Sequence, residues 1–327
     1  MPKVSVIIPN YNYEAYLSMR IESILQQTFQ DFEIIILDDN SSDDSKEIIH
    51  NFCNHPKVSN IIYNEVNSGS PFIQWKKGVE LAIGEWIWVA EADDLSDVQF
   101  LEKLLANTQK DKDIVLSYCQ SFKMDSESNT TGDWKDWTKD LDEIFFNSNF
   151  ILEGTEYIEK FLIMRNTIPN ASGVIFRKDA YLKVGKIDDS VKYCGDWFLW
   201  LKLLMIGKVA FCSEKLNYFR DHNKSVIATA SIKDEIIFIY KYDIILRKKF
   251  IEFLSENNQF SKNKTLKKLE LIKQNKVILS RECEMEAKLL KANGLKIQSI
   301  RYMIDSLCSG NNKKILFYRL IFRYLFS

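Results

Sequence analysis

The chain has 327 residues, of which 46% are hydrophobic and 13% aromatic, enough for one large domain or for a domain with an appendage. This composition excludes a disordered protein. The formal net charge of −1 conceals an asymmetry, because residues 240–327 carry 19 Lys and Arg against 8 Asp and Glu. The last part therefore has a net charge of +11, and residues 1–239 have −12. No nucleic-acid-binding module accompanies the basic part, so we expect no nucleic-acid partner.

Six scattered cysteines without a Cys-x-x-Cys pair indicate reduced thiols rather than a disulfide framework or a zinc site. Met1 is followed almost at once by a predicted strand, so we expect no signal peptide. No apolar stretch approaches the roughly 18–20 residues that span a bilayer. These features predict a cytoplasmic protein.

Strands and helices alternate over the first hundred residues. Short apolar runs predict strands at 4–8, 32–37, 58–63 and 86–90, and helical spacing predicts helices at 15–27, 46–53 and 71–83. This alternation predicts an α/β fold with a doubly wound, mainly parallel sheet flanked by helices.

The pattern is less regular after residue 95. It predicts helices at 96–108, 178–184 and 196–205, strands at 114–119, 171–176, 209–212 and 216–220, and an irregular insertion at 123–150. From residue 232 onward the spacing is helical. We therefore expect one domain over residues 1–230 and a basic helical extension over residues 231–327.

The most informative feature is a group of three acids, Glu91, Asp93 and Asp94, directly after the strand predicted at 86–90. Acids this close repel one another, so a fold places them together mainly when a cation or a donor-rich ligand compensates. A second acidic segment, Asp38–Asp44, follows the strand predicted at 32–37. Open α/β sheets bind ligands at the carboxyl ends of their strands. The sequence therefore predicts a metal-assisted site for a phosphorylated ligand.

Five segments occur in an order that resembles the family-2 glycosyltransferases of the GT-A fold, in the subgroup with a Glu-Ala-Asp-Asp motif. These segments are Val4–Asn12, Ser23–Phe29, Leu37–Asp43, Glu91–Asp94 and Gly195–Trp197. The resemblance covers roughly residues 1–225. It implies an inverting transfer of a sugar from a nucleotide donor to an acceptor hydroxyl, assisted by Mg²⁺ or Mn²⁺, in the assembly of a bacterial surface polysaccharide or another glycan.

The resemblance implies that Asp93 and Asp94 bind the cation, and that Asp93 also contacts the donor. Magnesium and manganese prefer oxygen ligands and retain several waters, so one or two carboxylates suffice. Glu91 stands where the family commonly has Asp, and its longer side chain binds the cation directly or through water. His222 either completes the cation shell or is a structural histidine.

Asp39 resembles the family residue that accepts a hydrogen bond from the base of the donor. Uracil, thymine and guanine offer a ring N–H for this contact and cytosine does not, which favours UDP, then dTDP or GDP. Asp43 and Asp44 are interpreted as turn and helix-capping residues. The other donor contacts are Pro9, Tyr11, Asn12 and Lys76, the last with a solvated lysine as its alternative.

Asp196 opens the helix predicted at 196–205, where the family has its catalytic base. An inverting transfer needs a base that removes a proton from the acceptor hydroxyl. The alternative is a helix N-cap or first-turn acid. The resemblance places Ser172, Gly173 and Trp197 on the side of the acceptor, which would be a glycan or a lipid-linked glycan.

The segment Lys313–Phe326 mixes basic and large apolar residues at helical intervals. It predicts either a helix lying on the inner face of the cytoplasmic membrane or a helix that covers the core or makes a homodimer contact.

Two other functions remain open. A nucleotidyltransferase predicts a Gly-rich basic loop after the first strand, which Pro9–Asn12 lacks, and the other alternative is a non-catalytic scaffold that binds sugar nucleotides.

Overall fold

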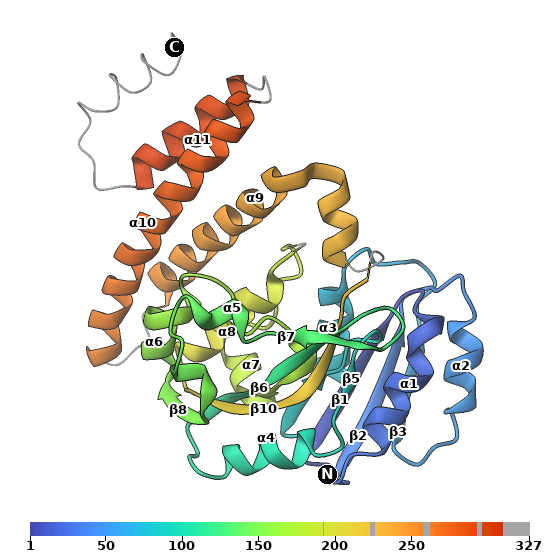
Figure 1. Ribbon diagram of the computed structural model, residues 1–327. Coiled ribbons are helices and arrows are strands. Elements are labelled where there is room, and N and C mark those ends of the chain that lie inside the picture. The colour runs from blue at the N-terminus through green and yellow to red at the C-terminus, as the bar shows by residue number, and fades with distance from the viewer. Residues whose placement is uncertain (192, 223–225, 258–261, 293–295, 310–327) are drawn as a thin grey trace. The chain divides into compact units, whose positions relative to one another are not determined.

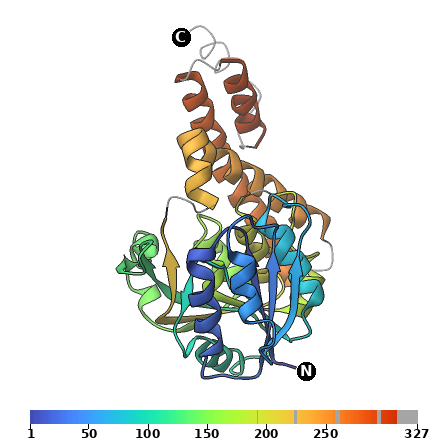
Figure 2. The ribbon, with the colours of Figure 1, turned by 90° about the vertical axis from the view of Figure 1, so that its right-hand side faces the viewer.

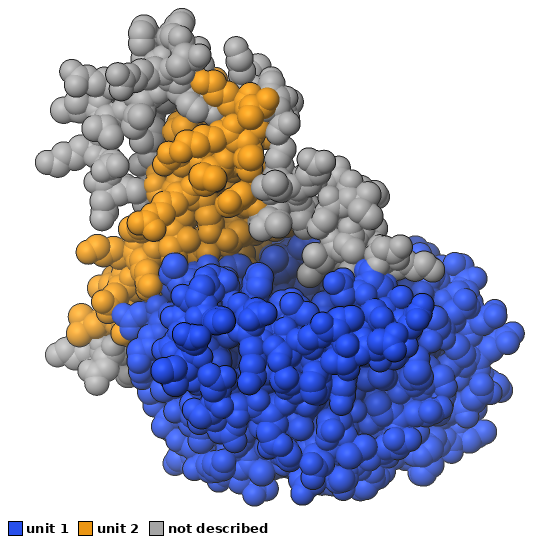
Figure 3. Space-filling model, in the orientation of Figure 1, with its two compact units in different colours: residues 1–222 blue, residues 223–327 orange. Residues whose placement is uncertain are grey.

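The computed structural model describes residues 1–191, 193–222, 226–257, 262–292 and 296–309. The chain divides into two compact units, Met1–His222 and Asn223–Ser327, which Figure 3 distinguishes by colour. The division comes upstream of the boundary predicted near residue 230. The two units are described separately below.

The first unit begins with a parallel half-sheet in the order β3-β2-β1-β4 (Figure 1). The predicted strands and helices of this half are confirmed, with ends that differ by a few residues. The elements are β1 (Val4–Asn10), α1 (Glu14–Leu25), β2 (Phe32–Asp38), α2 (Ser45–Asn51), β3 (Val58–Tyr63), α3 (Pro71–Leu81) and β4 (Trp86–Val89).

The central strands β1 and β2 are buried at every position, as expected for strands with both faces covered. Val6 and Ile8 of β1 pack in one core cluster with Ile21 of α1. The intervening Ile7 contacts α3 on the opposite face, where a Cβ added to Gly78 would lie 2.4 Å from Ile7 Cγ2. Figures 1 and 2 show the helices on both sides of the sheet.

The second half of the sheet is mixed, so the prediction of a mainly parallel sheet holds only for the first half. β9 (Val174–Arg177) runs antiparallel to both β4 and β6 (Ile114–Met124). β10 (Lys208–Arg220) is parallel to β6 and antiparallel to β5 (Leu95–Ser96). The α/β architecture with a central sheet between helices is confirmed.

Three predictions for this half were wrong in detail. The strands predicted at 209–212 and 216–220 are one strand, β10, which continues through polar residues by shifting its register against β6. The strand predicted at 171–176 begins only at Val174, after the 3₁₀ turn η3 (Ala171–Gly173). The predicted irregular insertion contains β7 (Thr130–Asp133), α5 (Asp136–Lys139), η1 (Phe145–Asn147) and the start of β8 (Phe150–Glu153).

The remaining helices of the first unit pack against the second half of the sheet. Two of them, α6 and η2, had no counterpart in the sequence prediction. They are α4 (Phe100–Thr108), α6 (Gly154–Tyr157), the π-helix η2 (Ile158–Leu162), α7 (Lys178–Lys183) and α8 (Gly195–Leu204).

The second unit is helical in its described part, as predicted, with α9 (Val226–Glu256), α10 (Lys262–Ala292) and α11 (Lys296–Ser309). The buried Arg247 of α9 donates to Glu282 (2.8 Å) and Asn275 (3.1 Å) of α10 and so ties the two helices together. None of the helices in the described ranges is both long enough and apolar enough to span a bilayer. The segment Lys313–Phe326 lies outside the described residues.

Gly84, just before β4, leaves no room for a side chain. An added Cβ would lie 2.6 Å from the backbone nitrogen of Ser5, which the sheet holds in place. We expect Gly84→Ala to lower the free energy of unfolding by about 3 kcal/mol, the upper end of overpacking costs, in urea titrations. Gly173→Ala is the control, because its added Cβ meets nothing closer than 3.5 Å. Equal stability of the two variants would contradict this expectation.

Candidate active site

The acidic strand ends meet at one edge of the sheet. Asn10 at the end of β1 pairs with Asp38 at the end of β2, and the N–H of Asp39 donates to the Asn10 carbonyl at 2.9 Å. On the other side of β1, the N–H of Ala90 donates to the carbonyl of Ile7 at 2.8 Å. The loop that follows Ala90 therefore leaves the sheet at the same edge as Asp39.

This loop, Glu91–Asp94, is anchored by hydrogen bonds from distant parts of the chain. The Glu91 N–H donates to Ser172 Oγ (3.0 Å), and Glu91 Oε1 accepts the indole N–H of Trp75 (2.8 Å). Asp94 accepts the backbone N–H of Arg220 (2.9 Å) and the side-chain amide of Asn170 (3.2 Å), one on each carboxylate oxygen. Both oxygens of Asp94 are therefore occupied by protein donors.

Asp93 is the more accessible of the two predicted cation ligands, with 15% of its side chain exposed. Its Oδ2 lies 3.0 Å from His222 Nε2, and it also shares a hydrogen bond with the Tyr13 hydroxyl. The Tyr13 ring lies edge-on to the imidazole of His222, with 5.8 Å between the ring centres. The structure thus brings Asp93 and His222 together, two residues that lie far apart in the sequence.

The acids of the loop raise each other's proton affinity. Burial, with a further contribution from the charge of Asp93, raises the pKa of Glu91 to about 8. Burial and the same charge also raise the pKa of Asp94. A bound cation would act in the opposite direction, because it favours the ionised carboxylates.

The residues fit a divalent cation that is completed by other ligands. Among the described residues, no group of three His, Cys, Asp or Glu side chains could hold a metal ion by itself. Mg²⁺ and Mn²⁺ keep several waters and accept phosphate oxygens, so one or two protein ligands are enough. Asp93 and His222 offer an oxygen and a nitrogen for this purpose, although Asp93 Oδ2 and His222 Nε2 now lie 3.0 Å apart and would have to separate to face a cation. Both oxygens of Asp94 accept hydrogen bonds from the protein.

Asp196 lies in the first turn of α8, after Cys194, which adopts a left-handed conformation (φ +60°). Its Oδ2 accepts the side-chain amide of Asn166 at 3.1 Å. Burial raises the pKa of Asp196 to about 6, although hydrogen bonds from Asn166 and from the backbone act against this rise. A carboxyl group with such a pKa is suited to take up a proton near neutral pH.

One short segment links Asp196 to the acidic loop. Asn166 donates to Asp196, and Asn170, four residues later, donates to Asp94. Four residues span at most about 14 Å even when fully extended. Ser172 continues the segment to the loop itself. The same short segment therefore contacts both Asp196 and the loop.

Helix α3 makes a second link. Gln74 donates to Asp39 Oδ1 at 2.8 Å, and the neighbouring Trp75 donates to Glu91. The ring of Phe72, at the start of the same helix, packs closely against the first residue of α8. Asp39, the acidic loop and the start of α8 thus all adjoin α3.

Asp39 is buried, with 4% of its surface exposed, and its carboxylate is already saturated. It accepts hydrogen bonds from the side chains of Asn64 (2.6 Å) and Gln74 and from the N–H and hydroxyl of Ser68. To accept the ring N–H of a base as well, Asp39 would have to lose one of these donors. In the structure its carboxylate fixes the 64–74 segment.

The other predicted donor contacts differ in how accessible they are. Tyr11 is 45% exposed, whereas Pro9 is buried in β1. Asn12 adopts a left-handed conformation, and its side chain accepts the N–H of Ser42 at 2.8 Å. Lys76 forms an ion pair with Asp189 (2.7 Å), so contact with a diphosphate would require this pair to open.

Asp43 is a capping residue, as predicted, because its carboxylate accepts the N–H groups of Glu14 (2.9 Å) and Ser45 (3.1 Å). Asp44 is the N-cap residue of α2 by position but makes no capping hydrogen bond with its side chain. Both acids belong to the turn before α2 and are not part of the acidic loop.

The acceptor-side predictions need correction. Ser172 is completely buried and accepts the N–H of Glu91, and Gly173 is buried beside it. Trp197 is 6% exposed and donates its indole N–H to the carbonyl of Leu162 at 2.9 Å. It cannot offer an open ring face to a sugar.

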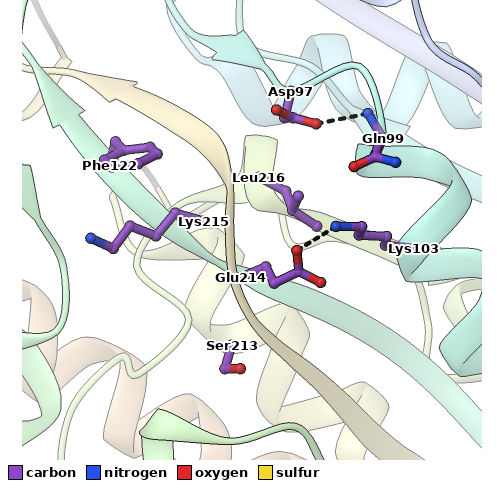
Figure 4. Close-up of a pocket in the computed structure, with 8 residues that line it drawn as sticks. All are labelled: Asp97, Gln99, Lys103, Phe122, Ser213, Glu214, Lys215 and Leu216. Atoms are coloured by element: carbon purple, nitrogen blue, oxygen red, sulfur yellow. Dashed lines mark hydrogen bonds and ion pairs between the residues drawn. The ribbon is translucent and has the colours of Figure 1, made fainter.

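A cavity of about 410 Å³ lies elsewhere, next to β10 and α4 (Figure 4). None of the predicted site residues lines it. Three of its charged side chains are in ion pairs, Lys103 with Glu214 and Lys215 with Asp133, and the fourth, Asp97, accepts the N–H of Gln99. We assign it no role in the chemistry.

The sequence-based prediction missed four residues that hold the site together. Gln74 and Trp75 lie in the helix predicted at 71–83, and the helical spacing does not reveal which side chains it directs toward the acids. The amides of Asn166 and Asn170 lie in a segment without regular structure, where no periodic signal marks them. These residues position the acids through hydrogen bonds.

The sequence profile of one known family, Glycosyl transferase family 2, matches residues 5–175, just over half of the chain. The chain belongs to this family. The predicted family is therefore confirmed, and the chain is a glycosyltransferase rather than a nucleotidyltransferase. The Glu-Ala-Asp-Asp subgroup stays a prediction.

Two curated relatives of this family-2 glycosyltransferase are bacterial. Glycosyltransferase GlyG of Streptococcus pneumoniae serotype 4 is 26% identical over 250 residues, which cover 69% of this chain and 73% of GlyG. Poly(ribitol-phosphate) beta-glucosyltransferase of Bacillus spizizenii is 28% identical over 211 residues, which cover 61% of this chain and only 32% of that enzyme.

Two solved structures share the fold. S. aureus TarS 1–349 in complex with UDP-GlcNAc has a TM-score of 0.62 at 16% identity, with 93% of this chain and 90% of TarS covered. The mannosyltransferase PcManGT from Pyrobaculum calidifontis, in complex with GDP-Man and Mn²⁺, has a TM-score of 0.58 at 14% identity, with 99% and 85% covered. At these identities the likeness concerns the fold alone.

Proposed function

We propose that this glycosyltransferase moves a sugar from a nucleoside diphosphate donor to an acceptor hydroxyl, with inversion and with the help of Mg²⁺ or Mn²⁺. The observation that carries the proposal is the Asn166–Asn170 segment, which holds Asp196 at one end and Asp94 at the other. One short segment thus contacts both a carboxyl group suited to act as a base and the acids suited to a cation. An inverting displacement needs both in one site.

Each residue then has a distinct task. Asp93 and His222 would hold the cation, and Asp94 would support them through its hydrogen bonds to Arg220 and Asn170. A bound cation neutralises the negative charge that develops on the departing diphosphate. Asp196 takes the proton from the acceptor hydroxyl, and Asn166 fixes the orientation of its carboxylate. Glu91 keeps the loop attached to Trp75.

For the donor we propose UDP first and dTDP or GDP next. Tyr11 is exposed at the end of β1 and is available to stack on the base. Asp39 accepts the ring N–H of the base in place of one of its present donors. The neighbours that share the fold bind UDP-GlcNAc and GDP-Man, so this fold accommodates both kinds of base.

The acceptor we propose is a glycan of the bacterial surface, free or lipid-linked. Support comes from the relative that is named for poly(ribitol-phosphate) glucosylation. The net charge of +11 in residues 240–327 would favour contact with an anionic lipid surface.

Thermal unfolding with a panel of sugar nucleotides tests the donor. A ligand that binds only the folded state at 100 times its Kd stabilises that state by about 2.7 kcal/mol. We expect the Tm to rise with UDP-sugars plus Mn²⁺ and the rise to be lost in EDTA. A CDP-sugar is the matched control, because cytosine lacks the ring N–H for Asp39. Equal stabilisation by CDP-sugars would refute the base contact, and none by any sugar nucleotide would refute the proposal.

A further inference from the structure

Arg20 of α1 is a completely buried charged residue to which the proposed function assigns no task. Its side chain is 0% exposed, and none of its three guanidinium nitrogens has a hydrogen-bond partner among the described residues. Burying a charge without partners is costly unless an opposite charge compensates for it. A fold that keeps Arg20 in this position must supply such a charge nearby.

The compensating charges come from the Glu91–Asp94 loop. The guanidinium carbon lies 5.0 Å from the ring centre of Trp88, which is three residues before Glu91 on β4. Burial lowers the pKa of Arg20 to about 10, and the charges of Asp94, Asp93 and Glu91 counteract this lowering. Arg20 therefore remains a cation at neutral pH.

Helix α1 also contacts the chain just beyond this loop. One turn after Arg20 the hydroxyls of Ser23 and Ser96 are 3.5 Å apart, and Gln27 donates to the carbonyl of Asp97 at 2.7 Å. The helix is thus tied to the residues just after the acidic loop, and the side chain of Arg20 is buried. Arg220, also buried, approaches the loop through its N–H to Asp94 and its Nε to the carbonyl of Asp93.

We propose that Arg20 is a built-in counter-charge for the acids of this loop and sets their affinity for the divalent cation. Together with Arg220 it counteracts the mutual repulsion of the Glu91, Asp93 and Asp94 carboxyl groups. The loop is then stable without a metal, and the cation binds only moderately until the diphosphate of the donor adds its own oxygens. Arg20 is a positioning residue, and this inference rests on the proposed cation site.

Binding of Mn²⁺ alone to the full chain tests this inference, with the free-ion signal in electron paramagnetic resonance as the readout. Arg20→Met keeps most of the volume but removes the charge, so we expect it to bind Mn²⁺ about tenfold more tightly than the wild type. Arg20→Lys keeps the charge and should stay within about threefold of the wild type. Arg177→Met is the control and should leave the affinity for Mn²⁺ unchanged. It removes an arginine of β9 that forms an ion pair with Asp179 of α7.

The outcomes separate the two proposals. If the wild type does not bind Mn²⁺, both the cation site and the counter-charge are refuted. If the wild type binds and Arg20→Met binds with the same or lower affinity, only the counter-charge is refuted, and Arg20 then merely packs against Trp88.

Thermal unfolding in EDTA and in excess Mn²⁺ adds a second test, because a loss of packing alone would not make the Tm depend on Mn²⁺. We expect Arg20→Met to have a lower Tm than the wild type in EDTA and to recover most of the difference in Mn²⁺, because the cation replaces the missing charge. Arg20→Gln is a second neutral variant with the same expectation. If both variants are unfolded with and without Mn²⁺, the result counts against the proposal, since a cation should compensate for the lost charge.

Discussion

Asp196→Asn is expected to lower kcat for sugar transfer by about 10³-fold, within the usual range for loss of a general base, and to leave donor binding unchanged. An amide cannot take the proton of the acceptor hydroxyl, but it preserves the size of the side chain and can still face Asn166. Transfer assays with the donor that gives the largest thermal stabilisation provide the measurement. Calorimetric titration of the same donor checks that binding persists.

Asp179→Asn is the matched control, because Asp179 is also a first-turn acid, on α7, but forms an exposed ion pair with Arg177. It should transfer at the wild-type rate. A near-normal rate for Asp196→Asn would remove this residue from the mechanism.

The pH dependence gives an independent check on Asp196. Because burial raises its pKa to about 6, the carboxylate form is lost as the pH falls through that value. The kcat/KM for transfer should therefore decrease about tenfold per pH unit below pH 6. A rate that stays constant down to pH 5 would contradict the assignment.

The same shift argues that Asp196→Asn will fold. The pKa of Asp196 in the folded state lies above its ordinary value of 3.8, so its contribution to stability is lost as the pH rises through about 6. Replacing it with a neutral amide should not lower the Tm at pH 8. A loss of transfer in this variant can then be assigned to chemistry.

The sequence predicted the elements best where local pattern and burial agree. The apolar runs that became β1 and β2 are buried at every position, and turn residues bound both of them. The pattern failed at β10, where Ser213 and Glu214 interrupt the apolar run but the strand continues by shifting its register. Such a continuation depends on the neighbouring strand β6, which local spacing does not reveal.

The candidate site could be predicted only in part, for a related physical reason. Asp93 was visible because a group of acids directly after a buried strand is unusual, and Asp196 was visible only through the resemblance to the family. Asn166 and Asn170 were not, because their partners lie 30 and 76 residues away in the sequence. Arg20 interrupts the apolar face of α1, but its significance depends on a loop about seventy residues later.

Asp93→Asn is expected to weaken Mn²⁺ binding at least about tenfold and to lower kcat by about 10³-fold. Asp93 has a more accessible carboxylate than Asp94, and its partner His222 can face an amide oxygen at the same position. The change removes one negative charge from the proposed ligands, while the anchors of the loop at Glu91 and Asp94 stay in place. Paramagnetic resonance of free Mn²⁺ and transfer assays at increasing Mn²⁺ concentration measure the two effects.

Asp97→Asn is the control in the same part of the chain, because its carboxylate accepts the N–H of Gln99 beside the cavity in Figure 4 and faces no predicted ligand. It should bind Mn²⁺ like the wild type. The expected change for Asp93→Asn is opposite in sign to that for Arg20→Met, since one variant removes a negative charge and the other a positive charge near the same cation. If both variants changed the affinity for Mn²⁺ equally and in the same direction, the loop would have been distorted. If neither variant changed this affinity, the cation would bind elsewhere.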